Sequence, residues 1–310
     1  MKSFRQYLQI VLVGLFMGMA ELVPGVSAAT IALISGYYER LLRALSQLTP
    51  RNLLRMGRLT GRAAWREADA GFLLLLLSAM GFSLVTSATL ISKALAEFPV
   101  AVGAFFFGIV SGSGLVLLQR VWQSNLTSLI CLGSGVLCGF GFSLVQPGAM
   151  EASVWHFFMS GLLGAFAWIL PGTSGGLVLL LLGLHGTVSA GLSLQQPSVL
   201  MPIAVCAVFG LLVFSQLLHT MLQKARQGLL LGLVGLMLGY SWKLWPWQVV
   251  SAYQLTGEDS SIPLVQEPVM PHTYEILGGV DPMVVTALSV GLFGFASVVL
   301  LNRILEIKHD

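Results

Sequence analysis

The chain has 310 residues, of which 56% are hydrophobic and only 9% charged, with a mean hydropathy of +0.86. Soluble domains carry roughly a quarter charged residues, so this composition excludes an ordinary soluble domain and indicates a polytopic membrane protein. The small net charge of +3 argues against nucleic-acid binding, and three cysteines without a Cys-x-x-Cys pair argue against a disulfide framework or a metal site. We expect no cofactor.

The first apolar segment is interrupted near its middle. Residues 7–23 and 25–42 would each make a helix of ~26 Å, which is shorter than a hydrocarbon core of ~30 Å. Pro24 removes a helical hydrogen bond at the break, and Gly25 frees the backbone there. Basic residues flank both ends. The pattern predicts a re-entrant hairpin over about residues 7–42 that enters from the cytoplasmic side.

A basic segment follows over about residues 50–67. Its arginines are spaced by four, three, four and four residues, so they share one face of a helix: Arg51, Arg55, Arg58, Arg62 and Arg66. This pattern is typical of a cytoplasmic amphipathic helix on anionic membrane lipids. Attraction of an anionic lipid substrate is the alternative role.

The rest of the chain contains further apolar segments and one long acidic loop. We expect a second interrupted hairpin over about 154–190 and an external acidic loop over about 249–281, which has no Lys or Arg. Positive residues mark the cytoplasmic side, so both termini are predicted to be cytoplasmic. Six membrane spans are predicted at about 72–92, 100–119, 126–145, 199–222, 228–247 and 283–302.

The two interrupted segments are copies of each other. Gly161, Pro171 and Gly183 each lie 147 residues after their counterparts Gly14, Pro24 and Gly36. Residues 1–20 also resemble a signal peptide, but residues 14–20 belong to this duplicated unit, which argues against cleavage. Three spans separate the copies, so the second copy is inverted.

The predicted fold is therefore an all-α integral membrane protein with an inverted-topology repeat. Each half, residues 1–150 and residues 151–310, would consist of one re-entrant helical hairpin broken at Pro-Gly and three transmembrane helices. In lipid, such a break survives only where it is buried in protein or lines a polar cavity.

Small and hydroxyl-bearing residues follow each break. Free N–H groups at a helix start, together with hydroxyls, can bind a phosphate or carboxylate. The same residues can instead cap the breaks and allow close packing, but their duplication in register favours an anion site. The predicted phosphate-binding residues are Ser27, Thr30, Thr173, Ser174, Gly175 and Gly176, after the breaks at Pro24-Gly25 and Pro171-Gly172.

Glu21 lies three residues before the first break. An ionisable group inside a membrane segment is a functional-site hypothesis, so Glu21 is a candidate for proton coupling or charge relay. The alternative to a functional role is that the carboxylate of Glu21 simply faces interfacial water near the tip of the hairpin. Basic residues at span ends are candidates to neutralise a bound phosphate: Arg40, Lys93, Arg120 and Lys243.

The paired motifs resemble those of a bacterial membrane family whose characterised members are PopT-type undecaprenyl-phosphate translocases. The family's first motif reads roughly Ala-Asp-x-x-Pro-Gly-x-Ser-Gly-Gly-Thr and corresponds to Ala20–Thr30, with Glu21 in place of Asp and Ala28 and Ala29 in place of two glycines. The second, roughly Pro-Gly-x-Ser-Gly with an apolar run and a Gly, corresponds to residues 171–183. The likeness covers most of the chain.

The resemblance implies a translocase without enzymatic activity in the bacterial cytoplasmic membrane. It would move undecaprenyl phosphate from the outer to the inner leaflet for reuse in cell-envelope glycan synthesis, by alternating access around a midplane site. Protons or another ion are candidate coupling partners, and an oligomer is compatible with the sequence. Because Gly175 and Gly176 are retained, the second hairpin is expected to bind phosphate more tightly.

Other functions remain open from the sequence. A secondary transporter of a small soluble anion would use the same site, and a channel or scaffold would need no transport cycle. Residues 172–175 also match the Gly-x-Ser-Gly of rhomboid proteases, with His185 eleven residues after Ser174. Eleven residues of helix span ~16 Å, so this Ser and His cannot form a catalytic pair on one helix.

Overall fold

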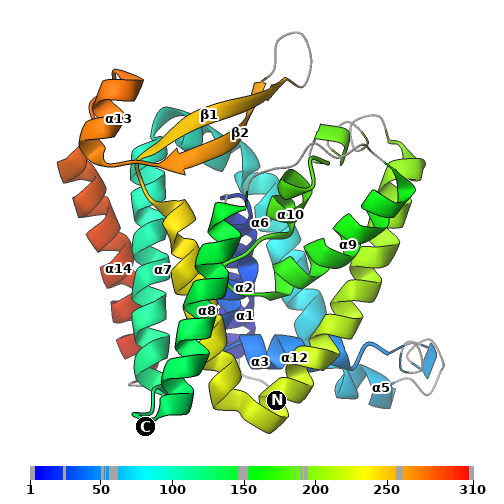
Figure 1. The fold of residues 1–310 in the computed structure, drawn as a ribbon. Helices are drawn as coiled ribbons and strands as arrows, with labels where there is room; N and C mark the ends of the chain where they lie inside the picture. The colour runs from blue at the N-terminus through cyan, green and yellow to red at the C-terminus, as the bar shows by residue number, and fades with distance from the viewer. Residues whose placement is uncertain are drawn as a thin grey trace.

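The computed structural model describes residues 4–23, 26–49, 52, 54–55, 62–145, 153–184, 186–188, 191, 195–255 and 261–306. The break residues Pro24 and Gly25, His185 and two arginines of the basic segment, Arg51 and Arg58, lie outside this part. The described chain is mostly helical (Figure 1).

Its helices are α1 (Phe4–Glu21), α2 (Ala28–Ile34), α3 (Tyr38–Ser46), α5 (Arg62–Glu67), α6 (Ala70–Glu97), α7 (Pro99–Val121), α8 (Leu126–Leu144), α9 (Val154–Ile169), α10 (Gly175–Leu181), α12 (Pro197–Tyr240), the 3-10 helix η1 (Ser241–Leu244), α13 (Pro271–Gly278) and α14 (Val284–Glu306).

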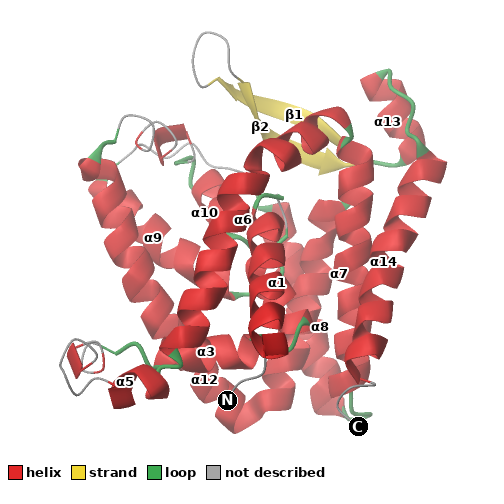
Figure 2. Cartoon of the chain, turned by 180° about the vertical axis from the view of Figure 1, so that it is seen from behind, coloured by secondary structure: helices red, strands yellow, loops and turns green. Residues whose placement is uncertain are grey.

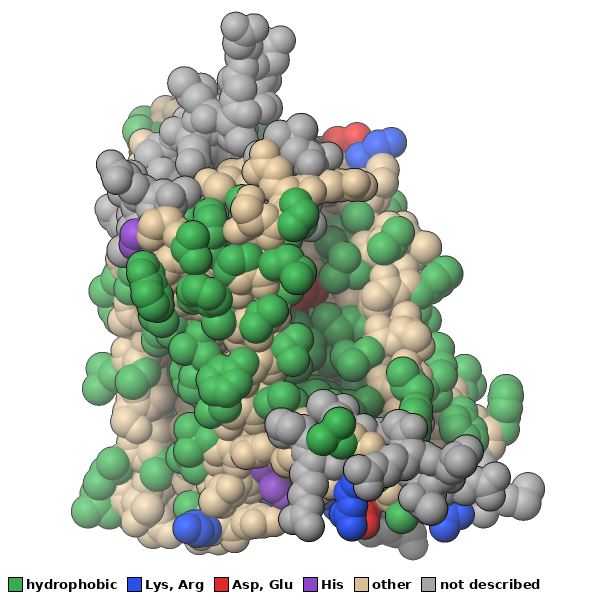
Figure 3. Space-filling model, turned by 90° about the vertical axis from the view of Figure 1, so that its right-hand side faces the viewer, with side chains coloured by type: hydrophobic (Ala, Val, Ile, Leu, Met, Phe, Trp, Pro, Cys, Tyr) green, Lys and Arg blue, Asp and Glu red, His purple; other side chains and the backbone are tan. Residues whose placement is uncertain are grey.

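The protein is a multi-pass membrane protein. In the described chain, four helices are long and apolar enough to cross a membrane, namely α6, α7, α8 and α12, and shorter apolar helices cover Val154–Ile169 and Val284–Leu300. Large apolar side chains such as Phe82 and Val85 are exposed on the outside of the bundle. Figure 3 shows such side chains over the middle of one face, as a surface in contact with lipid requires.

The first hairpin departs from the prediction after its break. We expected one arm over residues 25–42, but α2 ends at Ile34 and α3 begins at Tyr38. Gly36 takes a left-handed conformation with φ of +77°, and the N–H of Tyr37 donates to the carbonyl of Ala32 at 2.9 Å. This is a common way for a helix to end at glycine. Helix α3 then lies across the lower end of the molecule in Figure 1.

The second copy ends in the same way. Gly183 has φ of +69°, and the N–H of Leu184 donates to the carbonyl of Leu179 at 2.9 Å. These residues lie 147 positions after Gly36, Tyr37 and Ala32. The duplication therefore extends from sequence to the hydrogen bonds that terminate α2 and α10.

Helix α12 joins two of the predicted spans. The short connection expected between residues 222 and 228 is a sharp bend at one residue, and helix extends on both sides of it, from Pro197 to Tyr240. Ala225 alone leaves the helical region, with φ of −146° and ψ of 50°, and the helix bends there. The bend separates a first arm, residues 197–224, from a second arm, residues 226–240. Figure 1 shows the bend at the lower end.

The acidic loop is partly folded, so the all-α prediction needs a correction. Strands β1 (Gln248–Leu255) and β2 (Ser261–Pro268) form an antiparallel hairpin, which is followed by α13. Two indole N–H groups anchor its base: Trp245 donates to the carbonyl of Val269 at 2.8 Å and Trp247 to that of Pro282 at 2.7 Å. The sequence analysis predicted neither the two strands nor α13 in this loop.

The helices pack in two matching sets of pairs. Helix α1 packs on α6 and α9 on α12, while α7 packs on α14 and α8 on α12. Glycines set the close approach: Gly14 lies against α6 near Ala79, and its counterpart Gly161 lies against the first arm of α12 near Ala207. Helix α1 begins at the lower end and α9 at the upper end (Figures 1 and 2).

Candidate functional site

Residues that follow the first predicted break contact the second break. The N–H of Gly172 donates to the hydroxyl of Thr30 at 2.9 Å, and the hydroxyl of Ser27 donates to the carbonyl of Leu170 at 3.4 Å. Tyr38, just after α2, donates its phenol to the carbonyl of Ile169 at 2.9 Å. We call this cluster the paired breaks. It unites residues that lie more than 130 positions apart in the chain.

The predicted hydroxyls of the paired breaks are buried and bond within the protein. Thr173 donates to the carbonyl of Ala167 at 2.7 Å, and Ser27, Thr30 and Ser174 are each less than a tenth exposed. Of the two glycines, Gly175 is partly buried and Gly176 is exposed at the start of α10. In this arrangement the hydroxyls of Ser27 and Thr30 join the two hairpins, whereas that of Thr173 bonds within its own segment.

Glu21 caps the start of α2. Its carboxylate accepts the N–H of Ala28 at 3.2 Å, and the hydroxyl of Ser27 accepts the N–H of Ala29 at 3.2 Å. A carboxylate beside the free N–H groups of a first helical turn is a favourable arrangement. One of the protein's own anions thus lies where the sequence predicted a substrate anion.

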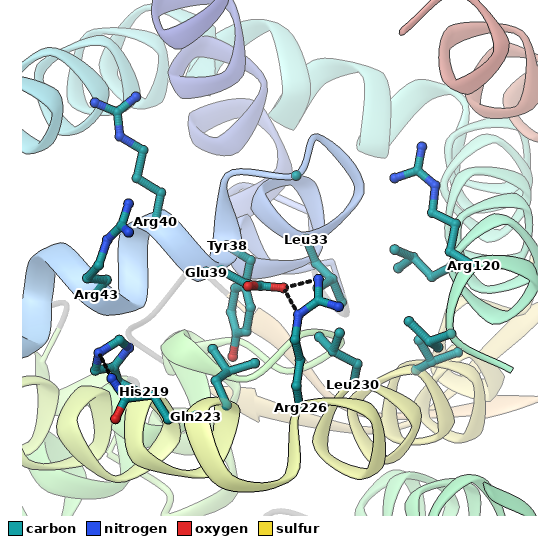
Figure 4. Close-up of a pocket in the computed structure, with 15 residues that line it drawn as sticks. Leu33, Tyr38, Glu39, Arg40, Arg43, Arg120, His219, Gln223, Arg226 and Leu230 are labelled. Atoms are coloured by element: carbon teal, nitrogen blue, oxygen red, sulfur yellow. Dashed lines mark hydrogen bonds and ion pairs between the residues drawn. The ribbon is translucent and has the colours of Figure 1, made fainter. Parts of the chain in front are cut away.

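A second polar feature is a cavity of about 540 Å³ at the lower end, which we call the arginine cavity (Figure 4). It lies among α3, the end of α7 and the bend of α12. Aliphatic side chains of Leu33, Leu117, Leu222, Leu230 and Val234 line part of it. Its basic residues come from all three helices: Arg40, Arg43, Arg120 and Arg226.

The four arginines differ in how they are held. Arg226 forms an ion pair with Glu39, with its Nε and Nη2 at 2.9 and 2.6 Å from Oε1. Arg40 lies 2.5 Å from a carboxylate oxygen of Asp69 and stacks on Phe72, with its guanidinium carbon 4.1 Å from the ring centroid.

The remaining two arginines reach the cavity from α7 and α3. Arg120 donates to the side-chain oxygen of Asn302. No described residue forms an ion pair with Arg43, which is exposed. Figure 4 shows arginine side chains on opposite sides of the cavity.

The structure separates the predicted phosphate neutralisers into two groups. Arg40 and Arg120 line the arginine cavity, whereas Lys93 and Lys243 do not. Lys243 lies in η1, where its ammonium donates to the carbonyl of Gln266 in β2 at 3.5 Å.

Sequence reasoning missed the roles of Arg43, Arg226 and Glu39 in this cavity. Arg43 follows Arg40 at i+3, a spacing that places both on one side of α3. Arg226 stands in what the sequence presented as a loop. Nothing in the sequence indicates that it meets Glu39, which is 187 positions away.

Helix α2 connects the two features. Ser27 caps its start at the paired breaks, and Leu33, near its end, lines the arginine cavity. Six residues of helix span ~9 Å. Tyr38 also belongs to both features, because it lines the cavity and bonds to Ile169 beside the second break.

The sequence matches known proteins over nearly its whole length. The family described as undecaprenyl phosphate translocase-like matches residues 17–261. The polyprenyl-phosphate transporter of Vibrio cholerae serotype O1 is 34% identical over 301 residues, which are 97% of each chain. The chain belongs to the undecaprenyl phosphate translocase-like family. No solved structure matches it.

Membership of the undecaprenyl phosphate translocase-like family confirms the resemblance that the paired motifs indicated. The matched region contains both features of the candidate site. It includes the paired breaks and every residue that lines the arginine cavity, from Leu33 to Val234. Both features of the candidate site therefore lie within the matched region.

Proposed function

We propose that this protein translocates undecaprenyl phosphate from the outer to the inner leaflet of the bacterial cytoplasmic membrane, for reuse in cell-envelope glycan synthesis. The observation that carries the proposal is the pair of hydrogen bonds that join Ser27 and Thr30, just after the first break, to Leu170 and Gly172 at the second break, inside a helical membrane protein of this family. The relative that is 34% identical over 97% of each chain is named a polyprenyl-phosphate transporter.

The proposed architecture is an inverted repeat of two re-entrant hairpins, each followed by three spans. Matching helix pairs support it, because α1 on α6 corresponds to α9 on the first arm of α12. The left-handed glycines Gly36 and Gly183 end α2 and α10 in equivalent ways. The starts of α1 and α9 at opposite ends of the molecule also agree with inversion (Figure 1).

A phosphate headgroup needs a polar path through the hydrocarbon, whereas the prenyl tail can remain in lipid. We propose that the paired breaks separate during transport and that Ser27, Thr30, Thr173 and Ser174 then turn from each other to the phosphate. The face drawn in Figure 3 is hollowed at mid-height, and acidic surface is visible inside the hollow. A lateral approach of a lipid headgroup to polar groups is consistent with that shape.

The two halves would rock about the paired breaks in an alternating-access cycle. Glu21 is the proposed coupling group, because protonation of its carboxylate would weaken the hydrogen bond that it accepts from Ala28. Arginines at the lower end, including Arg40, Arg43 and Arg226, support a cytoplasmic location for that end and for both termini.

The test is translocation of undecaprenyl phosphate in proteoliposomes. We expect transport by the unaltered protein and loss of at least tenfold in Ser27→Ala and Ser174→Ala, because each removes a hydroxyl from the proposed path. Ser83→Ala is a matched control, since Ser83 bonds to Leu15 between α1 and α6, away from the breaks. Glu21→Gln should transport with a changed dependence on pH.

Two results would contradict this proposal. Absence of lipid transport together with movement of a soluble phosphate would favour the transporter of a small anion. Equal activity of Ser27→Ala, Ser174→Ala and Ser83→Ala would restrict the hydroxyls to capping and packing. Family and relative both carry transporter names, which argues against an intramembrane enzyme.

A further inference from the structure

We propose that the arginine cavity is a second binding site for a phosphomonoester dianion, and that Glu39 competes with this ligand for Arg226. The inference rests on the proposed function only for the source of the phosphate, which would be the lipid headgroup. It concerns a region about one short helix away from the paired breaks, and it assigns a role to three residues that no motif contains: Arg43, Arg226 and Glu39.

The charge of the cavity favours a dianion. Four arginines and the carboxylate of Glu39 line it, and Asp69 compensates Arg40 from just outside the lining, so the formal charge is +2 when histidine is counted as neutral. A phosphomonoester carries a charge of about −1.5 to −2 near neutral pH and offers three acceptor oxygens. Guanidinium groups bind phosphate through two parallel hydrogen bonds. A ligand with less negative charge would form weaker hydrogen bonds with the same arginines.

The lining of the cavity favours an amphipathic ligand. Arg43, Arg120 and Arg226 are exposed, whereas Leu230 and Val234 are 6% and 1% exposed. The charged groups therefore lie at the rim and the aliphatic groups deeper. A volume of about 540 Å³ falls within the roughly 300–1,000 Å³ typical of small-molecule sites. A phosphate joined to an isoprenyl chain matches both parts, whereas inorganic phosphate matches only the rim.

The ion pair between Glu39 and Arg226 is suited to exchange with a ligand. The two side chains are 43% and 63% exposed, and exposed ion pairs contribute little to stability. A phosphate carries more charge than a carboxylate and can replace it on the guanidinium fork. Arg40 differs, because Asp69 and the ring of Phe72 hold it in place.

Exchange at Arg226 would also release one helix from another. Glu39 belongs to α3, which follows the first hairpin, and Arg226 follows the bend of α12 at Ala225. Their ion pair joins these helices at the cavity (Figure 4). A ligand that takes the place of Glu39 would open this connection at the end of the molecule where we propose that the headgroup leaves.

The test is binding of farnesyl phosphate and of inorganic phosphate to the purified full-length protein in detergent. Glu39→Gln should bind farnesyl phosphate about two- to fivefold more tightly, because an exposed competitor is removed. Arg226→Gln should bind it about tenfold more weakly, since a charge-assisted pair of hydrogen bonds is lost. Lys224→Gln is the matched control, because Lys224 is exposed on the same bend but does not line the cavity.

Unchanged or weaker binding by Glu39→Gln would overturn the competition, and equal binding by Arg226→Gln and Lys224→Gln would overturn the site. If Arg226→Gln does not fold, Arg226→Lys keeps the charge without the fork and should still weaken binding. Tighter binding of inorganic phosphate than of farnesyl phosphate would overturn the lipid as the source. The predicted binding changes in a protein that transports no lipid would support the site and reject the proposed function.

Discussion

The paired breaks and the arginine cavity each hold a carboxylate of the protein in a position suited to a phosphate, but they hold it differently. At the breaks, Glu21 accepts a backbone N–H beside buried hydroxyls that bond to the opposite hairpin. At the cavity, Glu39 pairs with an exposed arginine. Buried hydrogen bonds are expensive to leave unmade, whereas exposed ion pairs open easily.

This difference separates two kinds of effect. Substitutions at the paired breaks should lower folding stability, because they leave buried groups without partners or force backbones apart. Substitutions at the arginine cavity should change ligand affinity and its dependence on salt while they leave stability nearly unchanged. Four substitutions test this difference, and they follow in order of decreasing effect on stability.

Gly172→Ala should be the most disruptive. Gly172 has φ of +88°, and an added Cβ would lie 2.7 Å from the Cα of Met237. Backbone strain and overlap together should lower the free energy of unfolding by about 3 kcal/mol, measured by thermal unfolding in detergent. Gly36→Ala is the control at the cavity, because Gly36 has φ of +77° but no atom within 4 Å of an added Cβ. Equal losses for both would show that close packing of the second break on Met237 of α12 contributes nothing.

Thr30→Val should follow, with a loss of about 2 kcal/mol in the free energy of unfolding. The substitution preserves shape but removes the acceptor for the buried N–H of Gly172. Thr30→Ser keeps a hydroxyl and should retain most of the stability. If Thr30→Val were as stable as the unaltered protein, the hydrogen bond between the breaks would not stabilise the closed arrangement.

Tyr38→Phe should have a smaller effect, a loss of about 1 kcal/mol. Tyr38 is 1% exposed and donates to the carbonyl of Ile169 at 2.9 Å, so the substitution leaves one buried carbonyl without this donor. Chemical denaturation of the detergent-solubilised protein would measure it. A gain in stability would mean that the phenol is strained between the cavity and the second break.

Arg43→Gln should change stability least, by less than about 0.5 kcal/mol, because no described residue forms an ion pair with Arg43. Its affinity for farnesyl phosphate should nevertheless fall by about threefold, and the remaining binding should depend less on salt. Titrations at two ionic strengths would measure both. A clear loss of stability without a change in affinity would contradict the proposal that Arg43 contributes to ligand binding and not to folding.

Several features were predictable because they depend on short stretches of chain. The apolar spans, the Pro-Gly breaks and the basic flanks follow from hydropathy and from the backbone chemistry of proline and glycine. The end of α2 at Gly36 was not predicted, although Gly36 was visible as a duplicated residue. Gly36 ends α2 because its φ is positive, and glycine permits a positive φ but does not require it. The bend at Ala225 lies between two predicted spans, so its place was expected, but no proline or glycine at that residue indicated that the helices would meet without a loop.

Hydropathy and the duplicated motif are enough to identify a helical membrane protein and its family. The contacts of Thr30 with Gly172 and of Glu39 with Arg226 could be found only in the folded chain. These pairs are 142 and 187 positions apart. Hydropathy specifies which residues enter the membrane, but the contacts among helices depend on how glycines and side chains pack, and this is a property of the assembled bundle.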